Sequence, residues 1–139
     1  MTRDQILELC ASFAGAIEDY PFGDDVAVFK VGGRMFALVP LGEGTGSVSL
    51  KCDPDLAREL RAVYDEVRPG YHLNKRHWNT VELDGTIDDD ELRDMVDHSY
   101  GLVVKGLTRA QRASLSGGSA ARAADPLQST NESSASGST

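Results

Sequence analysis

Residues 70–85 read GYHLNKRHWNTVELDG, and their chemistry differs from that of the rest of the chain. They include Trp78, the only tryptophan, and the adjacent cations Lys75 and Arg76. No acidic residue lies in residues 69–81, although the 139-residue chain has a net charge of −8. A basic, aromatic and amide-bearing stretch in an acidic protein is the first candidate for a functional region.

Outward from this segment, hydrophobic patterning predicts both strands and helices. Thr80–Leu83 has the composition of a strand, and Val48–Lys51 predicts another. Within residues 26–39, Gly32-Gly33 separates two apolar runs, which is typical of a tight hairpin. Apolar residues at helical spacing predict four helices, at residues 2–16, 53–68, 88–105 and 108–115.

Polar residues at the starts of these helices support the assignment. Thr2 is followed three residues later by Gln5, and Asp88 is followed by Glu91, so each pair predicts a capping box. In the second helix the expected buried stripe comprises Leu56, Leu60, Val63, Tyr64 and Val67. The sequence therefore predicts an α+β domain that contains an antiparallel sheet.

Length and composition limit the domain organisation. We expect one domain over residues 1–115 and a disordered tail over residues 116–139, which are rich in Ser, Gly and Ala. No apolar run approaches the length of a membrane span, and the first residues do not resemble a signal peptide. Cys10 and Cys52 are expected to be free thiols. We therefore expect a monomeric cytoplasmic protein without a metal or cofactor.

Several stretches together resemble the MmcQ/YjbR family of small bacterial proteins. The matching pieces are YPFGDDVAVFKVGGRMFALV, SLKCDPDLARELR, GYHLNKRHWNTVELDG and DDELRDMVDHSYGLVVKGLTRAQR. The resemblance implies an antiparallel sheet with helices on one side, related to the double-wing domain of a phage transcription factor. Family members are described as DNA-binding on the strength of that relation, and a shared fold alone does not fix function. The resemblance supplies no catalytic residues.

Two basic stretches without acidic residues favour a nucleic-acid interface, because cations meet phosphates and an aromatic ring can stack on a base. The first is Arg68–Arg76 and the second is Lys105–Arg112. The predicted site comprises Arg68, Lys75, Arg76, His77, Trp78, Lys105, Arg109 and Arg112. With an acidic body, DNA binding through them is expected to be modest and sensitive to salt.

Other interpretations of the same residues remain open. Trp78 is also a candidate core residue, and Lys75 and Arg76 are candidates for ion pairs with the acidic residues 82–97. The cleft around residues 70–80 suits a non-enzymatic module that binds a protein or a small ligand. We find no catalytic constellation: His98 and Tyr100 are two positions apart on a helix, so they do not share a face.

Overall fold

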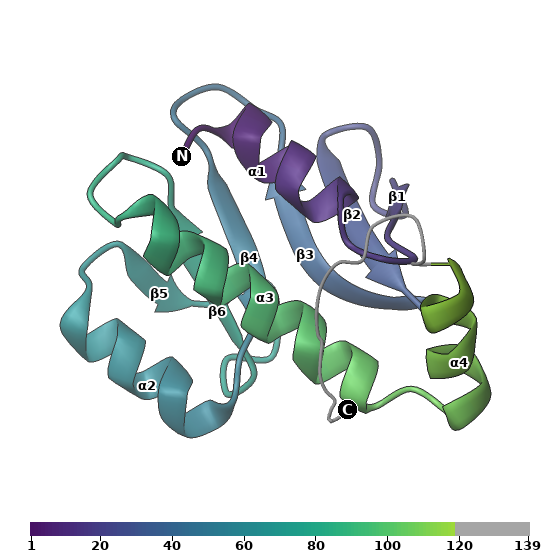
Figure 1. Ribbon diagram of the computed structural model, residues 1–139. Coiled ribbons are helices and arrows are strands. Elements are labelled where there is room, and N and C mark those ends of the chain that lie inside the picture. Colours follow the sequence, from purple (N-terminus) through teal and green to yellow (C-terminus); the bar gives the residue numbers. More distant parts are fainter. Residues whose placement is uncertain (119–139) are drawn as a thin grey trace. The chain divides into compact units, whose positions relative to one another are not determined.

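The computed structural model describes residues 1–118, so most of the predicted tail lies outside the described residues. Within residues 1–118 the chain forms an antiparallel sheet with the strand order β1-β2-β3-β4-β6-β5 (Figure 1). The strands are β1 (Ile17–Asp19), β2 (Val26–Val31), β3 (Arg34–Pro40), β4 (Ser47–Lys51), β5 (Val67–Pro69) and β6 (Trp78–Glu82). The helices are α1 (Arg3–Ala11), α2 (Pro54–Val63), α3 (Asp89–Lys105) and α4 (Arg109–Gly118).

The predicted hairpin and the two later strands are confirmed. β2 and β3 pair antiparallel around Gly32 and Gly33, whose φ angles of 58° and 80° are the positive values that a primed turn requires. β4 pairs with β3 on one side and with β6 on the other. The hairpin and the segment that contains Trp78 therefore belong to one sheet.

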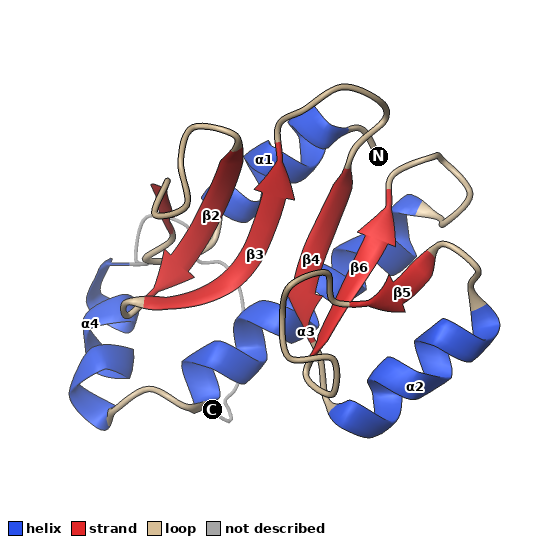
Figure 2. Cartoon of the chain, turned by 180° about the vertical axis from the view of Figure 1, so that it is seen from behind, coloured by secondary structure: helices blue, strands red, loops and turns tan. Residues whose placement is uncertain are grey.

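Helices α1 and α3 lie against one face of this sheet, here called the helical face (Figure 1). Figure 2 shows the opposite face of the sheet. Four aromatic rings join the layers, and they belong to Phe13, Phe29, Phe36 and Tyr100. The fully buried Ser99 donates to Phe36 O (2.5 Å) and accepts from Lys51 N–H (2.8 Å). This hydroxyl ties α3 to both central strands.

The N-terminal capping box and the cap of α2 agree with the sequence. Gln5 N–H donates to Thr2 Oγ1 and Thr2 N–H donates to Gln5 Oε1. Asp53 accepts from Leu56 N–H at the start of α2. The capping box predicted for Asp88 is wrong, because the side chain of Asp88 forms no capping hydrogen bond with α3.

Two helix boundaries differ from the prediction. α1 ends at Ala11, with Ser12 as its C-cap. It does not reach residue 16, because Gly15 adopts a φ of 73° and the chain then enters β1, where Ile17 is 64% exposed. α2 ends at Val63, so the predicted apolar stripe is only partly buried. Val63 is 71% exposed, and Val67 lies in β5.

The described chain divides into two compact units, one comprising Met1–Gly106 and one beginning at Leu107. The second unit contains α4, which begins with a confirmed cap: Gln111 N–H donates to Thr108 Oγ1 (3.1 Å) and Thr108 N–H donates to Gln111 Oε1 (2.9 Å). α4 continues to Gly118, past the predicted end near Leu115. Along residues 1–118, no helix combines the length and the apolar character that crossing a membrane requires.

Candidate functional site

The loop between β5 and β6 lies on the face of the sheet opposite α1 and α3, here called the open face (Figure 2). It begins at Gly70, whose N–H donates to Trp78 O at 2.8 Å. A Cβ atom on Gly70 would lie 2.7 Å from the Cβ of Trp78. Glycine is therefore needed at this position, because only a residue without a side chain allows the loop to turn so close to β6.

Trp78 anchors the loop to the sheet. It is 8% exposed and packs in a cluster with Val28 and Leu38, against which Leu73 from the loop also packs. Burial leaves little of the indole for a base to stack on, so we assign Trp78 to the core. Trp78 thus supports the site by holding the loop against the sheet.

Arg61 of α2 fixes the other end of the loop from the helical side. Its Nε donates to Asn79 Oδ1 (2.7 Å), and its Nη2 donates to the carbonyl oxygens of Lys75 and Trp78. Asn79 is 2% exposed, and its amide donates to Ala57 O (3.3 Å). One guanidinium thus joins α2, the loop and β6, an arrangement that suits its planar set of donors.

The loop and the open face of the sheet enclose a groove with a volume of about 840 Å³. Val26 and Leu38 provide an apolar floor. Beside it, the hydroxyls of Ser49 and Thr80 are hydrogen bonded at 2.8 Å, and Thr80 Oγ1 also accepts from Tyr71 N–H (3.1 Å). The groove therefore has an apolar centre, with hydroxyl groups from β4 and β6 along one side.

The charged side chains that line the groove are the cations Arg68 and Lys75. His72 lies beside them, and none of the described residues that line the groove is acidic. Arg68 forms an ion pair with Glu82, and Lys75 Nζ donates to Gly70 O at 3.0 Å. A groove without a lining carboxylate is unexpected in a chain of net charge −8 and favours an anionic ligand.

An exposed aromatic pair stands at the edge of the groove, and the sequence analysis did not identify it. Tyr71 is 71% exposed, and its ring centroid lies 4.0 Å from that of His72. His72 has a φ of 60°, and within residues 1–118 no other residue except glycine has a positive φ. Such strained backbone often occurs at functional sites. The sequence signal for Tyr71 was its position directly after Pro69-Gly70, where a turn exposes the next side chain.

The predicted site residues fall into three groups. Arg68, Lys75, Arg76, His77 and Trp78 come together on the loop and the strands beside it. Lys105 is the last residue of α3, while Arg109 and Arg112 belong to α4 in the second unit. Convergence of the two basic stretches on one surface therefore stays a prediction.

Lys75 and Arg76 form no ion pair with any described residue, so the interpretation that they neutralise the acidic residues 82–97 is wrong for these two cations. Arg76 is exposed, and its N–H donates to Asn74 Oδ1 (2.9 Å). Asn74 thus caps the turn of the loop. The side-chain charges of Lys75 and Arg76 remain available for an external anion.

Both cysteines are buried free thiols. Burial raises the pKa of the Cys52 thiol to about 11 and that of Cys10 to about 12, so both are protonated at neutral pH and poor nucleophiles. Residues 1–118 contain no group of three or more histidine, cysteine or acidic side chains placed to hold a metal ion. The half-buried Tyr100 packs against Phe13 and Phe36, and its hydroxyl donates to Ala14 O at 2.5 Å.

Comparison with known proteins places the chain in a family. The family model YjbR matches residues 11–102. Over 112 residues the chain is 38% identical to YjbR of Escherichia coli strain K12, which covers 81% of this chain and 95% of that protein. Over 90 residues it is 39% identical to YbdF of Escherichia coli O157:H7, which covers 65% of this chain and 74% of the relative.

Solved structures agree with this relationship. The crystal structure of Deinococcus radiodurans protein DR2400, with domain DUF419, has a TM-score of 0.78 at 41% identity and covers 83% of this chain and 88% of that one. A Pseudomonas syringae protein has a TM-score of 0.65 at 27% identity, over 74% of this chain and 99% of that one. The sequence match and the shared antiparallel α+β fold lead to one conclusion: the chain belongs to the YjbR family.

Proposed function

We propose that the protein is a nucleic-acid-binding module and that it holds single-stranded DNA in the groove on the open face. The observation that carries this proposal is the lining of the groove. Three basic side chains, a hydroxyl pair and an exposed tyrosine surround an apolar floor, and no described lining residue is acidic. Sheet faces with this combination bind nucleic acid by pairing phosphates with cations and stacking bases on aromatic rings.

A single strand fits this arrangement better than a duplex. In a duplex the bases are stacked on each other, so an aromatic side chain on a sheet face cannot reach them without unpairing. Tyr71 offers an exposed ring at the edge of the groove, whereas Trp78 is buried. Tyr71 therefore takes the stacking role that the sequence analysis considered for Trp78.

The same charges predict a modest affinity. Arg68 and Lys75 of the groove and Arg76 of the same loop supply three permanent cations, and Arg68 already pairs with Glu82. Each phosphate contact with a single strand contributes about −0.7 to the slope of log K against log salt. The acidic remainder of the chain repels other phosphates, so binding is expected to weaken sharply near physiological salt.

A second candidate function is the binding of a small anion with an apolar body in the same groove. Two features favour the binding of a small anion: the apolar floor formed by Val26 and Leu38, and the groove volume of about 840 Å³. Cavities of about 300–1,000 Å³ with a few polar groups are typical of small-molecule sites. A free mononucleotide combines both chemistries, so it is a useful competitor in a binding assay.

The test is fluorescence anisotropy with a labelled oligonucleotide of about 12 nucleotides, a length within the site sizes of single-strand-binding folds. It compares wild type with the double variant Lys75→Glu, Arg76→Glu at about 50 mM and about 200 mM salt. The matched control is Arg58→Glu, Arg93→Glu, which makes the same change in charge at exposed positions on α2 and α3. We expect the loop variant to bind the oligonucleotide about tenfold more weakly at low salt. The slope of log K against log salt should flatten by about 1.4, because two phosphate contacts are lost.

Three results would contradict the proposal. Equal loss of binding in the loop variant and the control would show that net charge alone governs binding. Tighter binding of a duplex of the same length would exclude the single-stranded mode. If neither DNA nor RNA binds at low salt but a mononucleotide does, the groove is a small-anion site.

A further inference from the structure

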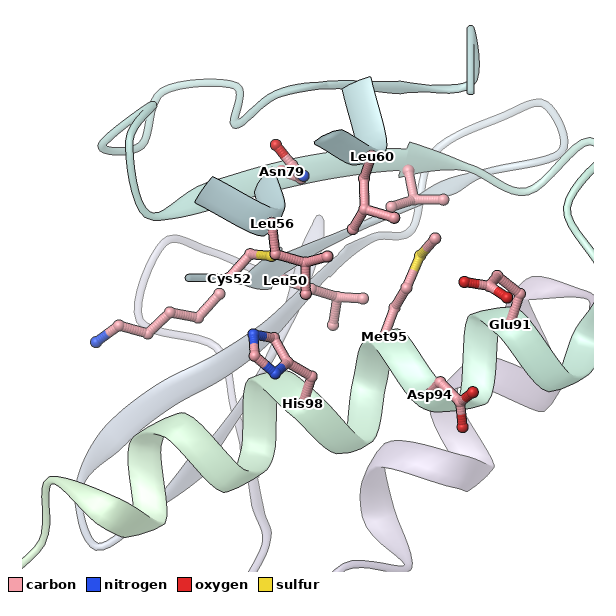
Figure 3. Close-up of a pocket in the computed structure, with 11 residues that line it drawn as sticks. Leu50, Cys52, Leu56, Leu60, Asn79, Glu91, Asp94, Met95 and His98 are labelled. Atoms are coloured by element: carbon pink, nitrogen blue, oxygen red, sulfur yellow. The ribbon is translucent and has the colours of Figure 1, made fainter. Parts of the chain in front are cut away.

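A second cavity lies on the helical face, between α2 and α3 (Figure 3). Its volume is about 250 Å³, and most of its wall is apolar: Leu50 and Val81 from the sheet, Leu56 and Leu60 from α2, and Met95 from α3. It shares no lining residue with the groove on the open face. Nothing proposed above for nucleic acid therefore involves this cavity.

The cavity exists because α2 does not close against α3. The sequence predicts Leu56 and Leu60 as buried core residues, but both are only half-buried and face the cavity (Figure 3). Protein interiors normally fill such space to crystal-like density. A dry apolar cavity of about 150 Å³ takes up benzene. The larger volume here has room for an aromatic ring with a short chain.

One side of the cavity carries negative charge. Glu91 and Asp94 line it from α3, three residues apart, and Met95 follows Glu91 by one helical turn. Within the described part of the chain neither carboxylate forms an ion pair, whereas Asp90 on the same helix pairs with Arg93. Glu91 is half-buried and Asp94 is exposed, so the two carboxylates form the solvent-facing rim of the apolar wall.

Apart from Lys51, the other polar groups of the wall are already engaged or uncharged. Asn79 bonds to Arg61 and Ala57, and His98 Nε2 accepts from Asp53 N–H at 3.2 Å. Cys52 has a protonated thiol. The cation Lys51 also lines the cavity and is next in sequence to Cys52, at the end of the cavity where His98 lies. His98 follows Glu91 by seven residues of α3, which corresponds to about 10 Å along the helix axis. A ligand cation is thus favoured at the Glu91 end.

We propose that this cavity is a binding site for a small organic amine. The apolar body of the amine lies against Leu56, Leu60 and Met95, and its ammonium group lies beside Glu91 and Asp94. Charge complementarity selects the cation, since a carboxylate of the same shape would meet two like charges. The volume limits the occupant to about the size of a phenylethyl group.

The experiment titrates 2-phenylethylamine into the full-length protein, followed by ¹H–¹⁵N NMR and calorimetry, with 3-phenylpropionate as the anion of similar shape. The test variant is Glu91→Gln, Asp94→Asn. The control variant is Asp55→Asn, Asp90→Asn, which removes the same charge from exposed positions that do not line the cavity. We expect the test variant to weaken amine binding by about tenfold, with little change in the control.

A cavity-filling variant gives an independent check. Leu60→Trp is expected to abolish amine binding while the carboxylates remain. Because a large side chain can also disturb folding, Leu56→Phe serves as a second and smaller cavity-filling variant. Leu56 lines the same cavity, so this substitution should also weaken amine binding.

The NMR and calorimetry results either support the amine site or overturn it. Amide shifts around Leu56, Leu60 and Met95, together with preference for the amine over the propionate, support the site. Binding that the test variant leaves unchanged, equal binding of the propionate, or shifts centred on Tyr71 and Thr80 would each overturn it. The absence of detectable amine binding at concentrations up to about 10 mM would also overturn it.

Discussion

Two aromatic residues of the same segment have opposite environments, and a mutation at each separates stability from binding. Trp78 is 8% exposed in a cluster with Val28 and Leu38, while Tyr71 is 71% exposed. We expect Trp78→Ala to lower the free energy of unfolding by about 3–5 kcal/mol through lost burial and a cavity. Tyr71→Ala should change the free energy of unfolding by less than about 0.5 kcal/mol. It should weaken DNA binding by about 1–3 kcal/mol, because the stacking of a base on the ring is lost.

Urea denaturation and anisotropy on both variants check this prediction. Native tryptophan emission adds a simple test, since a buried indole emits at shorter wavelength and shifts to the red on unfolding. A stable Trp78→Ala variant that binds DNA poorly would reverse the two roles.

His72 is the second residue whose conformation makes a prediction. It holds a φ of 60°, and the left-handed region costs a residue with a side chain about 1–2 kcal/mol. His72→Gly should therefore leave the protein as stable as the wild type or more stable by up to about 1 kcal/mol, while DNA binding falls because the ring beside Tyr71 is lost. Thermal unfolding with parallel binding measurements checks both parts, and a clear loss of stability would show that the ring supports the fold.

At the scale of elements, the position of the loop depends on α2. Arg61 donates to Asn79 and to two carbonyl oxygens of the segment, one from Lys75 and one from Trp78. Arg61→Lys keeps the charge and loses the planar fork, which leaves acceptors without donors. We expect a loss of about 1–3 kcal/mol in the free energy of unfolding.

The control is Arg58→Lys on the same helix. Arg58 pairs with Asp55, and the two side chains are 66% and 80% exposed, so this substitution should change stability by less than about 0.5 kcal/mol. Equal effects of the two substitutions would mean that Arg61 does not hold the loop in solution.

The elements also show which parts of the fold the sequence carries. The hairpin was predictable because Gly32-Gly33 stands between apolar runs, and α3 because its apolar residues recur at helical spacing. β1 and β5 were missed because each comprises three residues, too few for a period-two pattern to be distinguished from a loop. Their hydrogen bonds come from the neighbouring strands, which local sequence does not encode.

The groove was only partly predictable for the same reason. Charge segregation pointed to Arg68, Lys75 and Arg76 because these cations lie close together in sequence. The floor and the hydroxyl pair come from β2, β3, β4 and β6, and only strand pairing brings them together. The burial of Trp78 was one of two open interpretations, since a lone aromatic residue among cations fits a core anchor and a stacking platform equally.

At the scale of the whole molecule, an acidic chain carries a basic groove on the open face of its sheet. The open face carries the groove proposed as a phosphate site, lined by Arg68, His72 and Lys75, while the helical face presents Glu91 and Asp94 at the other cavity. Such a distribution orients an anionic ligand toward one face and limits its affinity elsewhere. The fold that produces these two faces is shared with the YjbR family and with the solved structure from Deinococcus radiodurans.

The measurement that tests the central claim most directly is an NMR titration of the full-length protein with a single-stranded oligonucleotide at low salt. If the open-face groove is the binding site, the largest amide shifts occur at Tyr71, Lys75, Ser49 and Thr80, and they disappear in the variant Lys75→Glu, Arg76→Glu. The amides of Leu60 and Met95, which line the cavity on the helical face, stay unchanged. Shifts centred on the helical face, or no shifts at any residue under these conditions, would contradict the account.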